Sequence, residues 1–234
     1  MLRFQTVPKA VLRAIAACLL SFVSVAQAQT FFPGQTGNAP GDFDFYVLAL
    51  SWSPSHCATN GGSRPDDLQC NARRPYGFIV HGLWPQYERG YPENCAIGNR
   101  RSGNSYVPRR IISSLSDIMP SQGLIIHEWR RHGSCSGLSP EDYFATLRRA
   151  YERVTIPGSM RNPVNDRRVD PRLVEKAFIA ANPGLPADGI STACNRGHLQ
   201  EVRICMTKDL QFRSCPEVDA RSCRSRAVKM PGTY

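Results

Sequence analysis

Two imidazoles, one carboxylate and two guanidinium groups lie within six residues of this 234-residue chain, at positions 127–132. Three apolar residues at positions 124–126 precede them, and Gly133 follows. The pattern predicts a short buried segment that turns helical, with Gly133 as the residue past its end. In such a helix Glu128 and His132 are four residues apart and lie on one face, about 40° apart around the axis. The segment therefore holds groups that can take and give protons near neutral pH.

The start of this segment resembles a zinc-binding helix, but its spacing differs. A zinc protease helix has its two histidines four residues apart, so that both reach one metal ion. Here His127 and His132 are five apart, which places them about 140° apart around an ideal helix. We therefore expect no metal and no cofactor at this segment.

A third histidine, His81, is expected at the end of a short apolar strand over residues 76–85. Two histidines whose pKa values are near ~6.5 can divide a proton-transfer reaction, one acting as base and one as acid. RNA offers such a reaction without a metal, because the ribose 2′-OH attacks its own phosphate and the 5′-oxygen leaves. Cations such as Arg131 and a protonated His127 would stabilise the charge that builds on the phosphoryl oxygens.

Aromatic residues near His81 suggest a place for a nucleobase. Trp84 can stack on a base, with Tyr87 or Tyr91 as the opposite wall. Taken singly, these residues have ordinary explanations: a tryptophan such as Trp129 is usually part of the core, and paired arginines usually form a solvated face. The argument for chemistry is that two apolar segments both end on histidines, which would be costly to bury together without a function. His56 and His198 are interpreted as structural.

Residues 1–28 have the features of a secretory signal peptide. The start carries only three charges, all positive, and an apolar run over residues 14–25 leads to Ala26-Gln27-Ala28. The run is too short to span a bilayer, and a lipid anchor at Cys18 is disfavoured because Arg13 leaves too few apolar residues before it. We expect residues 29–234 to form one exported domain, periplasmic or extracellular, with no membrane attachment after cleavage.

Charge and cysteine content fit an exported protein with a polyanionic partner. The formal net charge is +10, and removing the three cations of residues 1–28 leaves +7 over 206 residues. Removing the same residues also takes away one of nine cysteines. Export and an even cysteine count predict four disulfides, although the residues alone leave the pairing open. The cysteines involved are Cys57, Cys70, Cys95, Cys135, Cys194, Cys205, Cys215 and Cys223.

The order of predicted elements indicates the fold class. Residues 43–53 predict a buried central strand, and residues 190–212 predict two strands joined by a turn, with loops over residues 58–75 and 86–108. Strands and helices are mixed along the chain, without the regular alternation of βαβ units. We therefore predict an α+β fold with a central antiparallel sheet, several flanking helices and a single domain.

Helix starts are marked by a polar residue before a proline. Ser139 and Asp170 are expected to cap two helices that begin at the following prolines. The second helix is expected to bury Leu173, and a further short helix is predicted over residues 111–119.

Two long motifs resemble the ribonuclease T2 family. The first lies at residues 78–85 and includes His81 and Trp84. The second lies at residues 127–135 and includes His127, Glu128 and His132. Residues 45–54 with Cys57 resemble the first strand of the family, and the region from Cys194 to Cys223 fits its last strands. The resemblance covers essentially the whole chain after residue 28.

This resemblance implies metal-independent cleavage of single-stranded RNA through a 2′,3′-cyclic phosphate to 3′-phosphate ends, with low base specificity. It implies His132 as general base, His81 as general acid, Glu128 as an orienting or polarising carboxylate, His127 as phosphate binder and Trp84 as the base-stacking residue. The implied disulfides are Cys57–Cys70, Cys95–Cys135, Cys194–Cys223 and Cys205–Cys215. The partner is expected to be RNA and not DNA, and the chain is expected to be a monomer.

Two residues depart from the family pattern, and one alternative function stays open. Arg131 stands where the family usually has lysine, so its placement against phosphate can differ. Gln86 stands where fungal members have aspartate, which affects base preference. The alternative is a catalytically weak secreted module that binds RNA or another anion, and salt-sensitive RNA binding without a cyclic-phosphate product would favour it.

Overall fold

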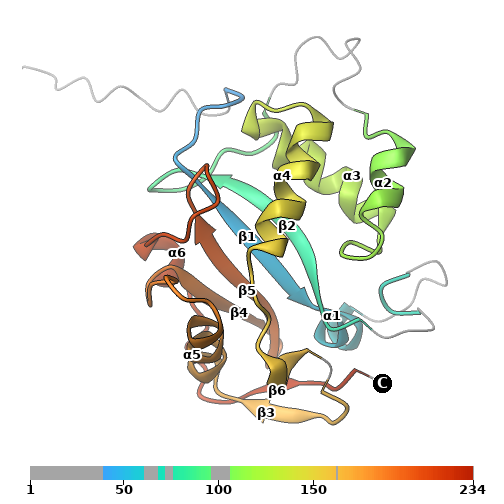
Figure 1. The fold of residues 1–234 in the computed structure, drawn as a ribbon. Coiled ribbons are helices and arrows are strands. Elements are labelled where there is room, and N and C mark those ends of the chain that lie inside the picture. Colours follow the sequence, from blue (N-terminus) through green and yellow to red (C-terminus); the bar gives the residue numbers. More distant parts are fainter. Residues whose placement is uncertain (1–38, 61–67, 72–75, 96–105, 162, 234) are drawn as a thin grey trace, which may run out of the picture. The chain divides into compact units, whose positions relative to one another are not determined.

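The structure is a computed structural model that describes residues 39–60, 68–71, 76–95, 106–161 and 163–233. The expected signal peptide at residues 1–28 lies outside the described residues. Figure 1 shows the arrangement of the elements. The strands are β1 (Phe45–Trp52), β2 (Phe78–Gln86), β3 (Arg167–Val169), β4 (Ile190–Asn195), β5 (His198–Met206) and β6 (Val228–Met230). The helices are α1 (Ser53–Asn60), α2 (Arg109–Ser114), α3 (Gln122–Arg131), η1 (Gly133–Ser136), α4 (Pro140–Glu152), η2 (Gly158–Met160), α5 (Pro171–Ala181) and α6 (Pro216–Asp219).

The strands form one sheet in the order β2-β1-β5-β6-β3, and β4 pairs with β5. The pairs of β1 with β2 and with β5 are antiparallel, as are β3 with β6 and β4 with β5. The predicted fold class is therefore confirmed, with one difference: β5 and β6 run parallel where His198 meets Lys229. A sheet with helices grouped beside it is the α+β arrangement.

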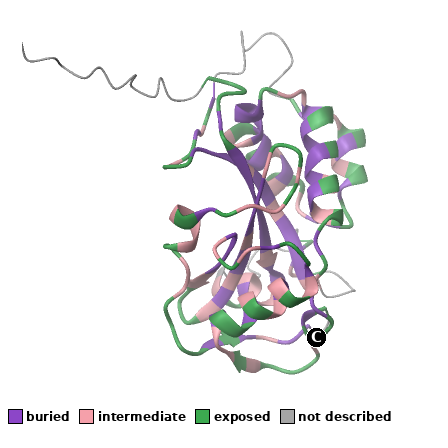
Figure 2. Cartoon of the chain, turned by 60° about the vertical axis from the view of Figure 1, so that its left-hand side comes forward, coloured by how far each residue is buried: buried purple, intermediate pink, exposed green. Residues whose placement is uncertain are grey.

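Strand β1 lies in the middle of the sheet and has two different faces. Tyr46, Leu48, Leu50 and Trp52 enter the main core, where each is at most 3% exposed. Burying one large apolar side chain of this kind contributes about 1.5–3 kcal/mol. Successive side chains of a strand point to opposite faces, so the alternate residues of β1 lie on the other face. Figure 2 shows the strands as mainly buried and the outer surfaces of the helices as exposed.

Both predicted capping residues begin helices. The Ser139 hydroxyl accepts a hydrogen bond from the backbone N–H of Asp142 at 3.1 Å, and Asp170 accepts one from the N–H of Arg172 at 3.0 Å. Each cap contributes about 1 kcal/mol. The expectation that Leu173 is buried is wrong: its side chain is 61% exposed, because the apolar face of α5 is formed by Val174 and Phe178.

Several predicted boundaries are also corrected. Strand β2 continues past Gly82 and Pro85 to Gln86, so His81 lies within the strand and not at its end. Proline is tolerated there because β2 is an edge strand of the described sheet. The loop predicted from residue 58 begins inside helix α1, and the helix predicted over residues 111–119 is the shorter α2.

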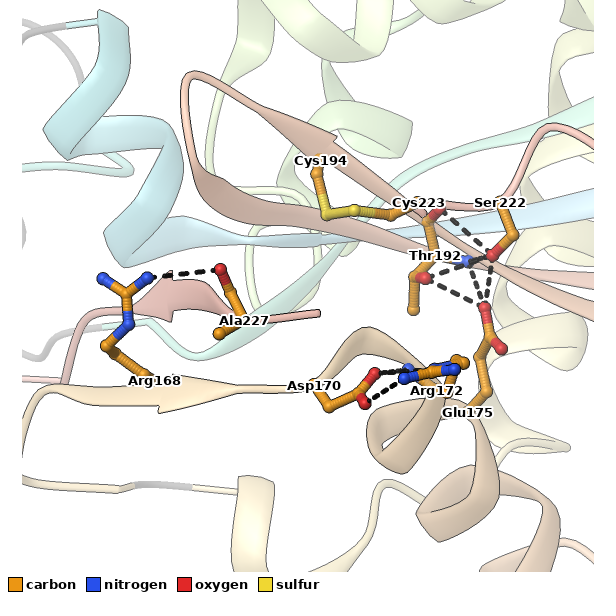
Figure 3. The surroundings of a disulfide bond; sticks show 9 residues. All are labelled: Arg168, Asp170, Arg172, Glu175, Thr192, Cys194, Ser222, Cys223 and Ala227. Atoms are coloured by element: carbon orange, nitrogen blue, oxygen red, sulfur yellow. Dashed lines mark hydrogen bonds and ion pairs between the residues drawn. A yellow bond between two sulfur atoms is a disulfide. The ribbon is translucent and has the colours of Figure 1, made fainter. Parts of the chain in front are cut away.

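Four disulfides join the chain, and they are the pairs implied by the family resemblance: Cys57–Cys70, Cys95–Cys135, Cys194–Cys223 and Cys205–Cys215. Cys95–Cys135 closes a separation of 40 residues. In the chain-entropy model a closed loop of that length stabilises the folded state by roughly 4 kcal/mol. Beside Cys194–Cys223, Glu175 accepts hydrogen bonds from Thr192 and Ser222, which fastens α5 and the C-terminal segment to β4 (Figure 3).

Within the described residues, no helix is long and apolar enough to cross a membrane. The same part of the chain contains no group of three or more His, Cys, Asp or Glu side chains placed to hold a metal ion.

Gly133 follows α3 as predicted, but packing explains it and capping does not. It is not among the residues with positive φ, and the left-handed residue after η1 is Gly137. A Cβ atom on Gly133 would lie 2.7 Å from the ring of Trp129 and 2.8 Å from the ring of Tyr143. The glycine therefore allows α3, η1 and α4 to pack closely.

We predict that Gly133→Ala lowers the free energy of unfolding by about 1–3 kcal/mol, because the added methyl group overpacks a site between two buried rings. The measurement is urea unfolding with the disulfides intact. Gly123→Ala is the matched control within α3, since its Cβ would come no closer than 3.8 Å to another heavy atom. Equal stability of Gly133→Ala and the unchanged protein would contradict the packing explanation.

Candidate active site

His81 is the extra residue of a β-bulge in β2. Ala49 pairs with Gly82 and the next pair is Leu50 with Val80, so His81 has no opposite residue on β1. Bulges redirect side chains and are frequent beside active sites. Here the bulge turns the imidazole toward a carboxylate on α3 and another on β5.

The two ring nitrogens of His81 face different glutamates. Nδ1 lies 2.5 Å from Oε1 of Glu201, and Nε2 lies 3.5 Å from Oε1 of Glu128. Burial by itself lowers the pKa of His81, but the hydrogen bond to Glu201 and the negative charges of both glutamates outweigh it. The net pKa of His81 is therefore raised above its ordinary value of 6.5. The raised pKa favours the protonated imidazole, which can act as an acid.

Glu128 is a buried carboxylate with one strong donor. It is 1% exposed, and the indole Nε1–H of Trp84 donates a hydrogen bond to its Oε2 at 2.7 Å. Burial raises its pKa to about 7, against the opposing effects of His81 and the Trp84 hydrogen bond. A Cβ atom on Gly82 would overlap both Glu128 Oε2 and Trp84 Nε1. The glycine on β2 therefore makes room for this contact between strand and helix.

His132 directly follows α3 and also lies close to Trp84. Its backbone N–H donates to the carbonyl of Glu128 at 3.0 Å, and its ring centroid lies 5.4 Å from that of Trp84. The Trp84 ring also lies 5.3 Å from the His81 ring, so the indole is close to both imidazoles. Burial, followed by the positive charge of Arg131, lowers the pKa of His132 to about 3. His132 is therefore neutral over most of the pH range and is suited to accept a proton.

Two cavities adjoin these residues. The larger, about 980 Å³, is lined by His81 and includes His56, Gln69 and Glu201. The smaller, about 270 Å³, is lined by Trp84, Tyr91, Arg131, His132, Gln86, Val47, Val218, Arg203 and Arg221. Arg203 lines both cavities. His81 therefore lines one cavity and His132 lines the other.

The predicted site residues do not all occupy the same place. The structure brings together His81, Trp84, Glu128 and His132. Arg131 lines the smaller cavity and its Nη2 lies 2.5 Å from Oε2 of Glu93. His127 is exposed and is not among the described residues that line the two cavities, although its positive charge contributes to lowering the pKa of His132.

The remaining aromatic and histidine predictions divide in a similar way. Tyr91, 45% exposed, lines the smaller cavity, whereas Tyr87 is in the core. His198 lies at the start of β5, with Nδ1 3.0 Å from the carbonyl of Arg196. His56 on α1 lines the larger cavity, although the sequence had suggested only a structural role for it. Trp129 is a core residue, as expected.

Glu201 and Arg203 on β5 were missed by sequence reasoning. Nε and Nη2 of Arg203 donate to Oε2 of Glu201 at 2.9 and 2.7 Å, and the guanidinium lies 5.2 Å from the centre of the Trp84 ring. The signal was available: a carboxylate and a guanidinium two residues apart on a predicted strand share one face. Nothing in that pattern indicated that His81, 120 residues away, would be their neighbour.

An α+β fold that brings two histidines, a tryptophan and a buried glutamate together has the groups of an acid–base catalyst. Comparisons with known proteins specify it further. The model of the Ribonuclease T2 family matches residues 43–215. A ribonuclease of Aeromonas hydrophila is 35% identical over 191 residues, which cover 75% of this chain and 77% of the relative. Ribonuclease DdI of Dictyostelium discoideum is 31% identical over 243 residues, covering 95% of this chain and 100% of the relative.

A solved structure agrees with these relatives. RNase NT in complex with 5′-AMP has a TM-score of 0.60 and 25% identity, covering 82% of this chain and 99% of that chain. This chain belongs to the ribonuclease T2 family. It is an RNA endonuclease, and RNA is its substrate.

We predict that Gly82→Ala lowers kcat/KM on RNA about tenfold or more, because the methyl group separates Trp84 from Glu128 and small displacements of catalytic groups are costly. Initial rates measure this effect, with circular dichroism to show that the variant is folded. Gly158→Ala is the control, since its Cβ would meet nothing within 4 Å. A Gly82→Ala enzyme as active as that control would show that the close approach of strand and helix is not needed.

Proposed function

We propose that this enzyme cleaves single-stranded RNA by transphosphorylation, without a metal ion, forming a 2′,3′-cyclic phosphate and then a 3′-phosphate end. The observation that carries the proposal is that two imidazoles, whose rings lie 5.3 and 5.4 Å from the ring of Trp84, have opposite electrostatic settings. The pKa of His81 is raised, and that of His132 is lowered to about 3. Titratable groups whose environments separate their pKa values are suited to separate acid and base roles.

In the first step, His132 takes the proton of the ribose 2′-OH as general base. The 2′-oxygen forms a bond to phosphorus, and the bond between phosphorus and the 5′-oxygen breaks. The protonated Nε2 of His81 gives its proton to the leaving 5′-oxygen, because Nδ1 is occupied by Glu201. The products are a 2′,3′-cyclic phosphate and a free 5′-OH, with His132 protonated and His81 neutral.

In the second step, the roles are exchanged. Neutral His81 takes a proton from water, the hydroxyl oxygen attacks phosphorus, and the bond to the 2′-oxygen breaks. Protonated His132 returns its proton to the 2′-oxygen, which leaves a 3′-phosphate and restores both imidazoles. The same two groups therefore serve both directions of proton transfer.

Charge on the phosphoryl oxygens needs donors and cations near the site. Arg131 lies beside His132, and its pair with Glu93 is about 40% exposed on the arginine side. An exposed pair of this kind contributes only about 0–1 kcal/mol, so Arg131 can turn to a phosphate at little cost. Glu128, with a pKa near 7, can share a proton with His81 or a phosphoryl oxygen. His127 as a second phosphate contact stays a prediction.

The two cavities suit the two nucleosides that flank the cleaved phosphate. Trp84 and Tyr91 in the smaller cavity offer stacking surfaces, which accept every base. Gln86 lines the same cavity, and its amide donates to the carbonyl of Pro85 at 3.1 Å. Because stacking does not read the hydrogen-bonding edges of a base, these surfaces support low base specificity.

The proposed setting of the enzyme is outside the cytoplasm. Four disulfides persist in oxidising compartments, and residues 1–28 have the composition of a signal peptide that is removed before residue 29. The mature domain would be a monomer in the periplasm or the medium. DNA would not be cleaved, because it lacks the 2′-OH that attacks phosphorus.

We predict that RNA is degraded in the presence of EDTA, with 2′,3′-cyclic phosphates as intermediates, whereas DNA is not degraded. His81→Ala and His132→Ala should each reduce turnover by about 10²–10⁴-fold, because each removes one proton-transfer group. Product analysis on the sixteen dinucleoside phosphates would also measure base preference. Loss of activity in EDTA, or wild-type rates in either variant, would reject the mechanism.

We predict a bell-shaped dependence of kcat/KM on pH, with its optimum in the acidic range. Activity should fall as the pH drops toward about 3, where His132 becomes protonated and cannot act as base. It should also fall as the pH rises above 6.5 and through the raised pKa of His81, where the acid is lost. Initial rates between pH 3 and pH 9 measure both limbs. A rate that keeps increasing from neutral to alkaline pH would contradict the assignment of acid and base.

A further inference from the structure

We propose that Glu201, held in place by Arg203, is a positioning residue for His81: it fixes which ring nitrogen of His81 faces the substrate and keeps that imidazole protonated for its role as acid. The inference rests on the proposed function, in which His81 protonates the leaving oxygen. It adds two residues of β5 to a site otherwise built from β2 and α3.

The geometry fixes the orientation of the ring. Glu201 Oε1 lies 2.5 Å from Nδ1 of His81. Because the carboxylate is an acceptor, Nδ1 carries the hydrogen and donates this hydrogen bond. Nε2 lies 3.5 Å from Oε1 of Glu128, and the His81 side chain lines the adjoining cavity. The hydrogen bond made by one nitrogen of a histidine determines what the other can do. Without Glu201 the ring could turn about its Cβ–Cγ bond, and neither nitrogen would be held toward the reacting oxygen.

Arg203 directs the carboxylate. Two of its nitrogens donate to Oε2 of Glu201, which leaves Oε1 for His81. The guanidinium also lies over the Trp84 ring at 5.2 Å, and the Trp84 indole donates to Glu128. The contacts therefore form a closed network, which runs through His81, Glu201, Arg203, Trp84 and Glu128. Each member is restrained by two neighbours.

Strand β1 makes this closed network possible, because the two residues that separate β2 from β5 at this point, Ala49 and Ser51, have small side chains. Ala49 pairs with Arg203 and Ser51 pairs with Glu201, so the long side chains of β5 can reach over β1 toward β2. Glu201 is 8% exposed. A carboxylate buried to that degree is costly unless it is paired, and its two partners here are Arg203 and the proposed acid.

The charged and titratable groups around His81 come from three parts of the chain. Glu201 and Arg203 approach from β5, Glu128 and His132 from α3, and His56 on α1 lines the same cavity. Burial acts to raise the pKa of Glu201, but the hydrogen bond and charge of His81, together with Arg203, lower it to about 2. Glu201 therefore stays ionised throughout the working range, and its charge favours the protonated form of His81.

The experiment is a titration of the His81 ring by NMR in the disulfide-bonded protein, with the resonances assigned from His81→Ala. Glu201→Gln keeps the shape of the side chain and removes its charge. We expect the pKa of His81 to fall by about one unit in this variant, and the alkaline limb of kcat/KM to move down with it. At pH 5 we expect kcat to fall about tenfold or more, with KM nearly unchanged, because orientation is lost as well as charge.

Glu175→Gln is the matched control. It makes the same chemical change in a glutamate that bonds Thr192 and Ser222 beside the Cys194–Cys223 disulfide (Figure 3). We expect it to lower stability without moving the titration of His81 or the alkaline limb. If Glu201→Gln is too unstable to purify, Glu201→Asp retains the charge but withdraws it by one methylene, and we expect a smaller fall in the pKa and a measurable fall in kcat.

The outcomes separate this inference from the proposed function. A His81 ring that titrates identically in the unchanged protein and in Glu201→Gln would overturn the positioning role, whether or not the enzyme forms cyclic phosphates. Absence of cyclic-phosphate products from the unchanged protein would overturn the proposed mechanism, while the NMR titration would still report on the contact between Glu201 and His81. An equal effect of Glu175→Gln on the alkaline limb would also overturn the inference.

Discussion

Glu128 carries its carboxylate on a side chain that is 1% exposed, and a buried carboxylate without partners is strongly destabilising. Its partners are the indole N–H of Trp84 and the imidazole of His81, both on β2. For these contacts to form, α3 must approach the strand more closely than a side chain at Gly82 would allow. The same contacts place Trp84 close to both imidazoles. Pairing this one buried carboxyl group therefore organises the strand, the helix and the acid–base residues together.

One face of the sheet carries the main core, and the other face carries the polar side chains of the site. One face of β1 carries Leu48, Leu50 and Trp52 into the main core, and the other carries Ala49 and Ser51 beneath the polar side chains. Along β2, Val80 and Leu83 both enter the core although they are three residues apart, and the bulge at His81 absorbs the extra residue. The bulge keeps the core continuous and frees His81 for the polar face. A strand without the bulge would place either His81 or Leu83 on the wrong face.

Covalent links hold the less regular parts of the site. Cys95–Cys135 joins the segment after β2 to η1, directly beyond His132. In the same region the N–H of Asn94 donates to the carbonyl of Arg131 at 2.7 Å, and Glu93 contacts the Arg131 guanidinium. The end of α3 is thus restrained from outside the sheet. Restraint of this kind reduces the reorganisation needed when charge develops on the substrate.

The sequence by itself determined the residue types that do the chemistry, the α+β class and the helix starts at Ser139 and Asp170, because motifs, periodicity and capping are local properties. Only the tertiary structure decided that His81 lies in a bulge, since a bulge depends on the register between β1 and β2. Glu201 became part of the site in the same way: the pairing of β5 with β1 brings it to His81, from which it is 120 residues away in the sequence. Gly133 was predicted at the correct place for the wrong reason, since the rings of Trp129 and Tyr143 exclude a Cβ atom there. Pairing across long separations and the pKa shifts that follow from burial are properties of the folded chain, and no local pattern contains them.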